Sequence, residues 1–321
     1  EDYRLTLEFT SNPAWYAVQA LPVLSVPESD NAVSWFASYY ANTLGMHISK
    51  TYPKVSAMIE AWKKQGGDSE TLLSNLEKNQ ELKNVLLEET PWVLEAKNES
   101  EQKQKLALLF DLNRNQNLTR QAIDKLKELQ ATQGGWSWFK GFYPSRSITQ
   151  YILYGFNRLK ELEAVEFSDD ILSMQAKAIA YLDEEVLEGF KNLKKQNRNW
   201  RNLKTIPVYD LEYLYVRSSY GQYPISKELQ EMIGFYTSVI EKNWTQSGLY
   251  ERSLIAVLMQ KNNKQNIVQD MLKSYREHAT ISEEMGMFWA NNRAHVFMSQ
   301  SAVSVHTFIM DSSGTLGGAG E

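Results

Sequence analysis

Carboxylates are the side chains in this sequence with the clearest potential for chemistry. Asp210 and Glu212 stand two positions apart in the tyrosine-rich segment 209–223. Two carboxylates beside aromatic rings are what glycosidases use to protonate a glycosidic oxygen and to attack the sugar or activate water. Acidic pairs also occur on solvated helix faces and at helix starts, where the dipole favours them. The other pairs in the chain are Asp169-Asp170, Glu184-Glu185 and Glu283-Glu284.

Other kinds of active site find little support. The chain has no cysteine, so it has no thiolate nucleophile, thiolate metal ligand or disulfide. We see no glycine-rich phosphate loop and no Ser-His-Asp signature. None of the four histidines shows the HxH or HExxH spacing of a zinc site; they are His47, His278, His295 and His306. We therefore expect no catalytic residue, no metal and no cofactor, and interpret the protein as a non-enzyme.

The charge of the chain also limits its partners. Its 321 residues carry a formal net charge of −5, which argues against a nucleic-acid partner because phosphates require a basic stripe. The basic residues Lys194, Lys195, Arg198 and Arg201 are expected at a solvated helix end. No apolar run approaches the roughly 20 residues that span a bilayer, so no direct membrane insertion is expected.

The apolar spacing indicates a mostly helical chain. Serine or aspartate at 145, 168–170 and 226 precedes three of the helical patterns, as N-cap residues do. Residues 3–9 alternate apolar and polar side chains, which predicts one short strand, and no internal strand is evident. Periodicity predicts paired helices without choosing between a closed ring and an open solenoid. The predicted helices cover residues 98–113, 118–129, 147–162, 170–190 and 226–241.

Two further segments resemble a known family. Residues 12–22 read Asn-Pro-Ala-Trp-Tyr-Ala-Val-Gln-Ala-Leu-Pro, and Tyr40-Ala41-Asn42 follows. This resembles the beginning of the thioester domain in bacterial alpha-2-macroglobulins. Members with a working thioester carry a Cys-x-Glu-Gln motif shortly before Tyr-Ala-Asn. Here Asn31 and Ser34 stand at that position, so the resemblance implies a domain that has lost its thioester, and we interpret both residues as the cap and first turn of a helix.

A loop near the middle of the chain supports the same resemblance. Residues 130–139 read Gln-Ala-Thr-Gln-Gly-Gly-Trp-Ser-Trp-Phe, which is similar to loops of α/α toroids. The resemblance implies that Trp136 packs between helix pairs. For Trp138 and Phe139, packing and a ligand-stacking platform both remain open. Residues 288–292 and 299–307 resemble the last repeat of such a toroid, in which a tryptophan-bearing loop leads into a closing helix.

The resemblance implies a fold and a function. The fold is an all-α toroid of roughly six helical hairpins over residues 13–311, after a strand at 1–12 and before a flexible tail at 312–321. The function is that of a thioester-less, non-enzymatic domain in a protease-trapping protein of the bacterial cell envelope. Its partners would be other domains of its parent chain and proteases, and a lipoprotein anchor on the parent would hold it in the periplasm or at the cell surface. The alternatives are a carbohydrate-active toroid (a glycosidase or polysaccharide lyase) and a scaffolding or adhesion module.

Overall fold

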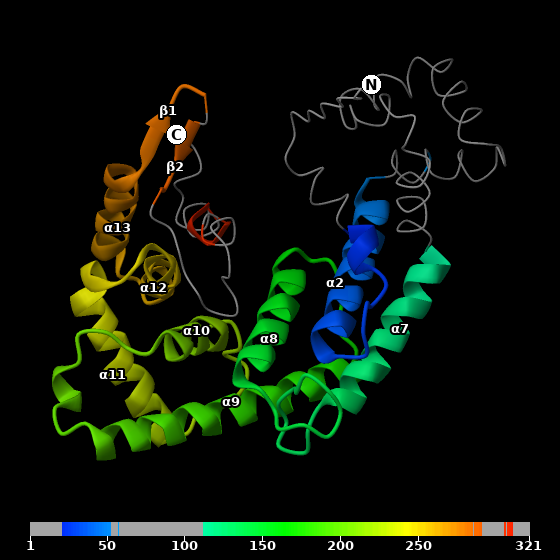
Figure 1. Ribbon diagram of the computed structural model, residues 1–321, viewed down its shortest axis with the longest axis horizontal. Helices are drawn as coiled ribbons and strands as arrows, with labels where there is room; N and C mark the ends of the chain where they lie inside the picture. Colours follow the sequence, from blue (N-terminus) through cyan, green and yellow to red (C-terminus); the bar gives the residue numbers. More distant parts are fainter. Residues whose placement is uncertain are drawn as a thin grey trace, which may run out of the picture. The chain divides into compact units, whose positions relative to one another are not determined.

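The computed structural model describes residues 21–52, 57, 112–284, 286–290, 305 and 307–310. Within these ranges lie eight α-helices of ten residues or more, two short 3-10 helices and one pair of strands (Figure 1). The all-α prediction is therefore confirmed at the level of fold class. The predicted strand at 1–12, the tail at 312–321 and most of the predicted helix 98–113 lie outside the described residues.

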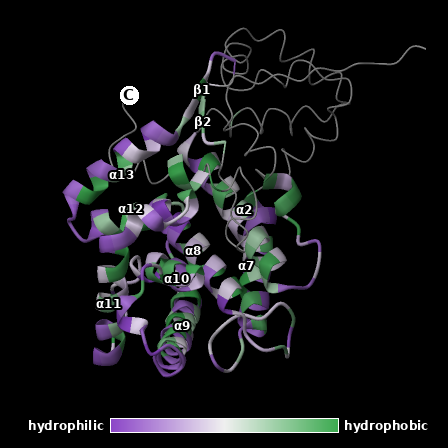
Figure 2. Ribbon diagram, turned by 60° about the vertical axis from the view of Figure 1, so that its left-hand side comes forward, coloured by the Kyte–Doolittle hydropathy of each residue, from purple (hydrophilic) through white to green (hydrophobic). Residues whose placement is uncertain are grey.

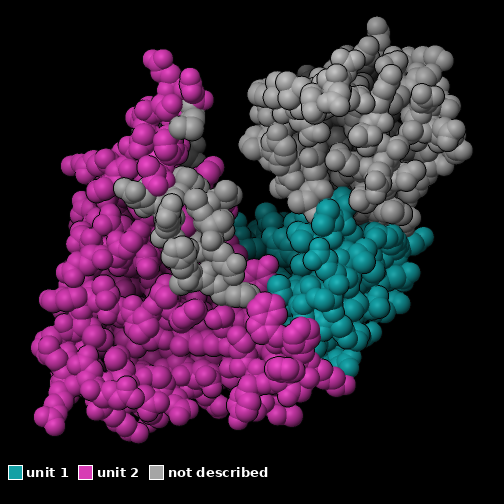
Figure 3. Space-filling model, viewed as in Figure 1, with its two compact units in different colours: residues 1–129, 158–170 teal, residues 130–157, 171–321 magenta. Residues whose placement is uncertain are grey.

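The chain divides into two compact units, coloured separately in Figure 3. Unit 1 comprises Glu1–Leu129 and Arg158–Asp170, and unit 2 comprises Gln130–Asn157 and Ile171–Glu321. Each is described by itself below.

Unit 1 is built on α2 (Ala32–Thr51), which packs along α7 (Leu112–Leu129). Apolar residues of both helices fill its core: Trp35, Phe36, Tyr39, Ala122, Leu126 and Leu129 are buried. The predicted break between 113 and 118 is wrong, because α7 continues through this stretch. Asn115 is completely buried there. Because this buried position holds a polar residue, the apolar repeat by which a helix is predicted is interrupted.

Unit 2 holds most of the remaining helices. Neighbouring helices in the sequence contact one another at the pairs α11 with α12 and α12 with α13, and α10 also contacts α12. Hydrophilic and hydrophobic residues interleave along α9 and α13, as expected of half-buried helices (Figure 2). The helices are α8 (Arg146–Glu161), α9 (Asp169–Gln196), α10 (Val208–Arg217), α11 (Lys227–Asn243), α12 (Leu249–Lys261) and α13 (Gln265–His278).

The predicted helix boundaries and faces agree closely with three of these helices. The Ser226 hydroxyl caps α11 by accepting a hydrogen bond from the Leu229 amide at 3.2 Å. Asp169 and Asp170 lie in the first turn of α9, and Lys194 and Lys195 lie in its last turn. Leu162 departs from the prediction: α8 ends one residue earlier, and the side chain is 46% exposed. Apolar residues at helical spacing in these three segments are buried: Ile148, Ile152, Phe156, Leu159, Ile171, Ala178, Leu182, Phe190, Leu229, Tyr236 and Ile240.

The expectation of no internal strand is wrong. Strands β1 (Thr280–Ser282) and β2 (Gly286–Phe288) pair antiparallel, with Ile281 opposite Met287. Three residues are too few for an alternating pattern to stand out in a sequence. Trp289 follows β2 directly and is buried, and its indole donates a hydrogen bond to the Tyr275 carbonyl oxygen at 2.9 Å.

Two 3-10 helices, η2 (Trp200–Asn202) and η3 (Trp244–Gln246), complete the described elements. The Trp200 ring packs edge-on against Phe190 and Phe235, at centroid distances of 5.7 and 5.0 Å. This aromatic cluster joins the segment after α9 to α11.

Candidate functional site

The start of α2 is the first candidate site, because the sequence resemblance singled out Asn31 and Ser34 there. Asn31 is the N-cap of α2, with an extended backbone. Its Oδ1 atom accepts a hydrogen bond from the Ser34 amide at 2.8 Å, and its carbonyl oxygen accepts one from the Trp35 amide at 3.0 Å. The amide nitrogen Nδ2 donates to the Ser29 hydroxyl. The prediction that these residues cap an ordinary helix is confirmed.

Farther along α2, Asn42 anchors the segment that precedes the helix. Its side-chain nitrogen donates to the Ser25 and Ser38 carbonyl oxygens, both at 2.8 Å. The Ser38 hydroxyl also donates to the Ser25 carbonyl oxygen, at 2.7 Å. Ser25, Ser38 and Asn42 are all buried. Asn42 of the Tyr-Ala-Asn motif therefore has a structural role, because it binds the backbone of the segment before α2.

The loop before α8 contains the second predicted site. Trp136 is completely buried, as a packing role requires. Its ring lies 6.4 Å from that of Phe156, and its amide donates to the Thr149 hydroxyl at 2.9 Å. Gly134 has a φ of +99°, and a side chain there would collide with the Lys177 backbone of α9. The two glycines of the motif therefore allow the loop to pass close over α9, since a Cβ at Gly135 would meet the Tyr181 ring.

Trp138 and Phe139 differ from Trp136. Their exposed fractions are 44% and 47%. The structure therefore separates a buried tryptophan from two exposed aromatic neighbours within the same loop.

The two carboxylates of α10, Asp210 and Glu212, are buried, whereas acidic pairs usually lie on solvent-exposed faces. Asp210 is 6% exposed and Glu212 is completely buried, so neither lies on a solvated face. Both sit in a helix whose residues from Asp210 to Arg217 are all buried. For this pair, the solvated-face interpretation is wrong, because both acids are enclosed within unit 2. The helix-start interpretation does apply to Asp210, which lies in the first turn of α10.

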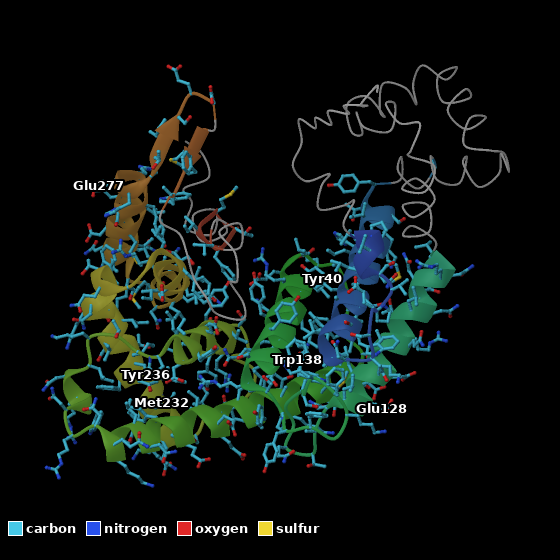
Figure 4. The ribbon with its side chains drawn as sticks, viewed as in Figure 1. Tyr40, Glu128, Trp138, Met232, Tyr236 and Glu277 are labelled. Carbon is cyan, nitrogen blue, oxygen red and sulfur yellow. The ribbon has the colours of Figure 1, made fainter. Side chains whose placement is uncertain are left out.

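The two acids belong to one connected network of side chains from four helices. Arg146 of α8 forms an ion pair with Asp210 at 2.7 Å and donates from Nε to the Gln150 amide oxygen at 2.8 Å. Gln150 in turn donates to Glu212 Oε2 at 3.4 Å. Tyr236 of α11, labelled in Figure 4, donates its hydroxyl proton to Asp210 Oδ2 at 2.8 Å.

At the other end of this network, the Tyr250 hydroxyl of α12 donates to Glu212 Oε1 at 2.7 Å. We call the six residues Arg146, Gln150, Asp210, Glu212, Tyr236 and Tyr250 the α10 network. Desolvation raises the pKa of Glu212 to about 7, although the hydrogen bond from Tyr250 and the charge of Arg146 oppose the rise. Burial and the nearby carboxylates raise the pKa values of Tyr236 and Tyr250.

The α10 network satisfies its own polar groups. Glu212 accepts hydrogen bonds from Gln150 and Tyr250, whereas Asp210 accepts one from Tyr236 and forms an ion pair with Arg146. In the ion pair with Asp210, Arg146 is the more exposed partner, with 21% of its side chain accessible to solvent. A glycosidase needs carboxyl groups that reach a bound sugar. The geometry instead fits a network that fixes four helices against one another.

The tyrosine-rich segment around these acids is also occupied with packing. Tyr213, Tyr215 and Tyr220 are buried. Tyr213 donates to Asp183 of α9 at 2.6 Å, and Arg217 forms an ion pair with the same carboxylate at 3.0 Å. Tyr213 thus joins α10 to α9, and the Tyr220 hydroxyl donates to the Leu153 carbonyl oxygen of α8 at 2.6 Å. The carbohydrate alternative would instead require these tyrosines along a cleft.

Sequence reasoning singled out Asp210 and Glu212 but missed their partners. Arg146, Gln150 and Tyr250 lie between 38 and 64 positions away along the chain, and no local motif marks them. The one available signal is that Arg146 and Gln150 are four residues apart at the start of a predicted helix, which places them on one face.

Comparisons with known proteins add no assignment: no protein-family model, curated protein or solved structure matches this chain. Among the described residues, no three histidine or acidic side chains gather as a metal site would require. No described helix combines the length and apolar content needed to cross a membrane.

Proposed function

We propose that this chain is a non-enzymatic, thioester-less domain of a bacterial alpha-2-macroglobulin-like protein that traps or inhibits proteases. The observation that carries the proposal is the start of α2. There, Asn31 caps the helix by accepting a hydrogen bond from the Ser34 amide. The sequence resemblance aligns these two residues with the reactive cysteine and glutamine of that family. Amide and hydroxyl groups engaged in a cap provide no thiol leaving group for acyl transfer.

For the arrangement of helices, we propose an α/α toroid of roughly six hairpins over residues 13–311, preceded by a strand at 1–12. The contacts of α11 with α12 and of α12 with α13 are those of hairpins that follow one another in the sequence. An experimental structure of the chain with the parent's neighbouring domains tests this arrangement. An open superhelix would contradict it.

The proposed mechanism of inhibition is steric and non-covalent. The domain would pack against other domains of its parent chain and against a captured protease, at the periplasmic or outer surface of the cell. A caged protease loses access to large substrates while small peptides still diffuse to its active site. The full-length parent should therefore inhibit cleavage of a folded protein substrate far more than cleavage of a short chromogenic peptide. Equal inhibition of both substrates, or none of either, would contradict the proposal.

The carbohydrate-active alternative is weaker because both candidate carboxylates are enclosed in the α10 network. A screen of the chain against polysaccharides, read as release of reducing ends or of unsaturated products, separates the two. Cleavage that Glu212→Gln abolishes would favour the carbohydrate alternative over the inhibitor.

A further inference from the structure

The loop over residues 137–144 exposes a large amount of aromatic surface. Exposed fractions are 44% for Trp138, 47% for Phe139, 65% for Phe142 and 88% for Tyr143. Large apolar side chains scattered singly over a surface need no explanation, but a contiguous exposed group marks an interaction site. We call these four side chains the aromatic tip.

The base of this loop is fixed to unit 2. The Ser145 amide donates to the Trp136 carbonyl oxygen at 2.8 Å, which closes the loop across its base. Tyr181 of α9 donates its hydroxyl proton to the Pro144 carbonyl oxygen at 3.1 Å. With Trp136 buried below, the loop is attached at both ends. A partner of the aromatic tip would therefore bind a largely pre-ordered surface.

The tip itself is folded as a turn. The Ser137 hydroxyl donates to the Phe139 carbonyl oxygen at 2.7 Å, and the Phe142 amide donates to the same oxygen at 3.2 Å. The rings of Phe139 and Phe142 meet edge to face at 5.9 Å. Gly141, with a φ of +81°, supplies the left-handed residue of the turn. Two hydrogen bonds thus converge on one carbonyl oxygen of the turn, while the four aromatic side chains keep a large exposed fraction.

The charge of the segment favours one kind of partner. Residues 131–160 contain no aspartate or glutamate, and the aromatic tip encloses one basic residue, Lys140. Tryptophan and tyrosine concentrate at membrane–water interfaces, phenylalanine enters the acyl boundary, and lysine is attracted by lipid phosphates. In Figure 1 the connection between α7 and α8, which includes this loop, projects past α9 at the lower edge of the ribbon.

We propose that the aromatic tip docks into the interfacial region of a lipid bilayer, with Phe139 and Phe142 at the acyl boundary and Trp138 and Tyr143 at the level of the headgroups. The sequence-based expectation of no direct membrane insertion rested on the lack of an apolar run long enough to span a bilayer, and the present proposal departs from it. A loop that enters the headgroup region needs no such length. The proposal stands apart from the protease-trapping function, because it concerns the chain alone.

A sugar fits the aromatic tip less well. Sugar recognition combines a stacking ring with hydrogen-bonding side chains around it. Here the Ser137 hydroxyl is used inside the turn, and the Tyr181 hydroxyl is bound to the loop backbone. A lipid interface requires exposed rings and tolerates a lack of directed hydrogen bonds.

The test is co-sedimentation of the full chain with phosphatidylcholine vesicles in high salt, about 0.5 M, where surface charges are screened within a few ångströms. The native chain should sediment with the vesicles in proportion to the lipid concentration. The double variant Phe142→Ser with Tyr143→Ser should lower the partition coefficient by at least about tenfold, because two apolar rings no longer leave water. Its circular dichroism and melting temperature should remain unchanged, since both side chains are exposed.

The matched control is Ile281→Ser with Met287→Ser, which removes two similarly exposed apolar side chains from the hairpin, 80% and 56% exposed. This control should bind vesicles like the native chain. Three results would overturn the proposal. They are no sedimentation of the native chain, equal loss of binding in both double variants, and loss of self-association in the tip variant while vesicle binding is unaffected.

Discussion

The start of α2 and the α10 network bring polar side chains together in two different ways. Asn31, Ser29 and Ser34 lie within six residues, and their hydrogen bonds are those of a helix cap. The α10 network assembles side chains from α8, α10, α11 and α12, in which Arg146 and Tyr250 are more than a hundred positions apart. A local cap contributes little to stability and can be changed easily. A buried network joins several helices, so removing one member leaves another unpaired.

This difference explains why we expect substitutions at the start of α2 to have little consequence for the fold. It also explains why acids in α10 can look catalytic in the sequence while serving to hold helices together. The following predictions test the contrast, beginning with the largest expected effect.

Replacing Trp136 should affect stability most. Trp136→Ala should lower the free energy of unfolding by about 3–5 kcal/mol, because a fully buried indole leaves a cavity beside Phe156. Thermal or urea denaturation followed by circular dichroism measures this loss. Trp138→Ala is the matched comparison, since that ring is 44% exposed and should cost much less. An unchanged melting temperature for Trp136→Ala would show that the burial of Trp136 is wrong.

Within the α10 network, Arg146→Ala should destabilise the chain by about 3 kcal/mol, since Asp210 would remain buried without its cation. The double variant Arg146→Ala with Asp210→Asn should recover part of that loss, because the unpaired charge is gone. Urea denaturation of the four proteins of this cycle gives the coupling energy. Simple additivity of the two substitutions would contradict a direct ion pair.

The raised pKa of Glu212 should make the free energy of unfolding depend on pH. Because its pKa is raised to about 7 in the folded protein from an ordinary 4.5, the folded chain holds a proton that the unfolded chain releases. The resulting stabilisation is fully present below pH 4.5 and is lost as the pH rises through 7, by up to about 3 kcal/mol. Urea midpoints measured across this range for native chain and Glu212→Gln test the effect. The variant should lose this component of the slope, and an identical slope in both proteins would contradict it.

The cap should show the smallest effect. Asn31→Ala should cost about 1 kcal/mol and Asn31→Ser or Asn31→Asp only a few tenths, because serine and aspartate also accept the Ser34 amide hydrogen bond. Differential scanning of the three variants measures this order. A loss comparable to that of Trp136→Ala would mean that Asn31 does more than cap a helix.

The sequence predicts the fold well where helices have one buried face. The patterns at 147–162, 170–190 and 226–241 lie within a few residues of α8, α9 and α11 except for the longer end of α9. Helix α12 has no such face, because Ser253 through Met259 are all buried and periodicity vanishes. The α10 network could not be predicted for a different reason. Its contacts join residues of different helices and depend on how those helices pack, whereas periodicity in the sequence shows only which residues share a face of one helix.

The measurement that tests the central claim most directly is mass spectrometry of this domain after reaction. The full-length parent is mixed with an active protease and, separately, with labelled methylamine, then denatured, and the region containing this chain is weighed. The account predicts no mass increase, because there is no cysteine to be acylated and Asn31 and Ser34 form a cap. A mass increase on this domain that survives denaturation would contradict the account and would require a different reactive group.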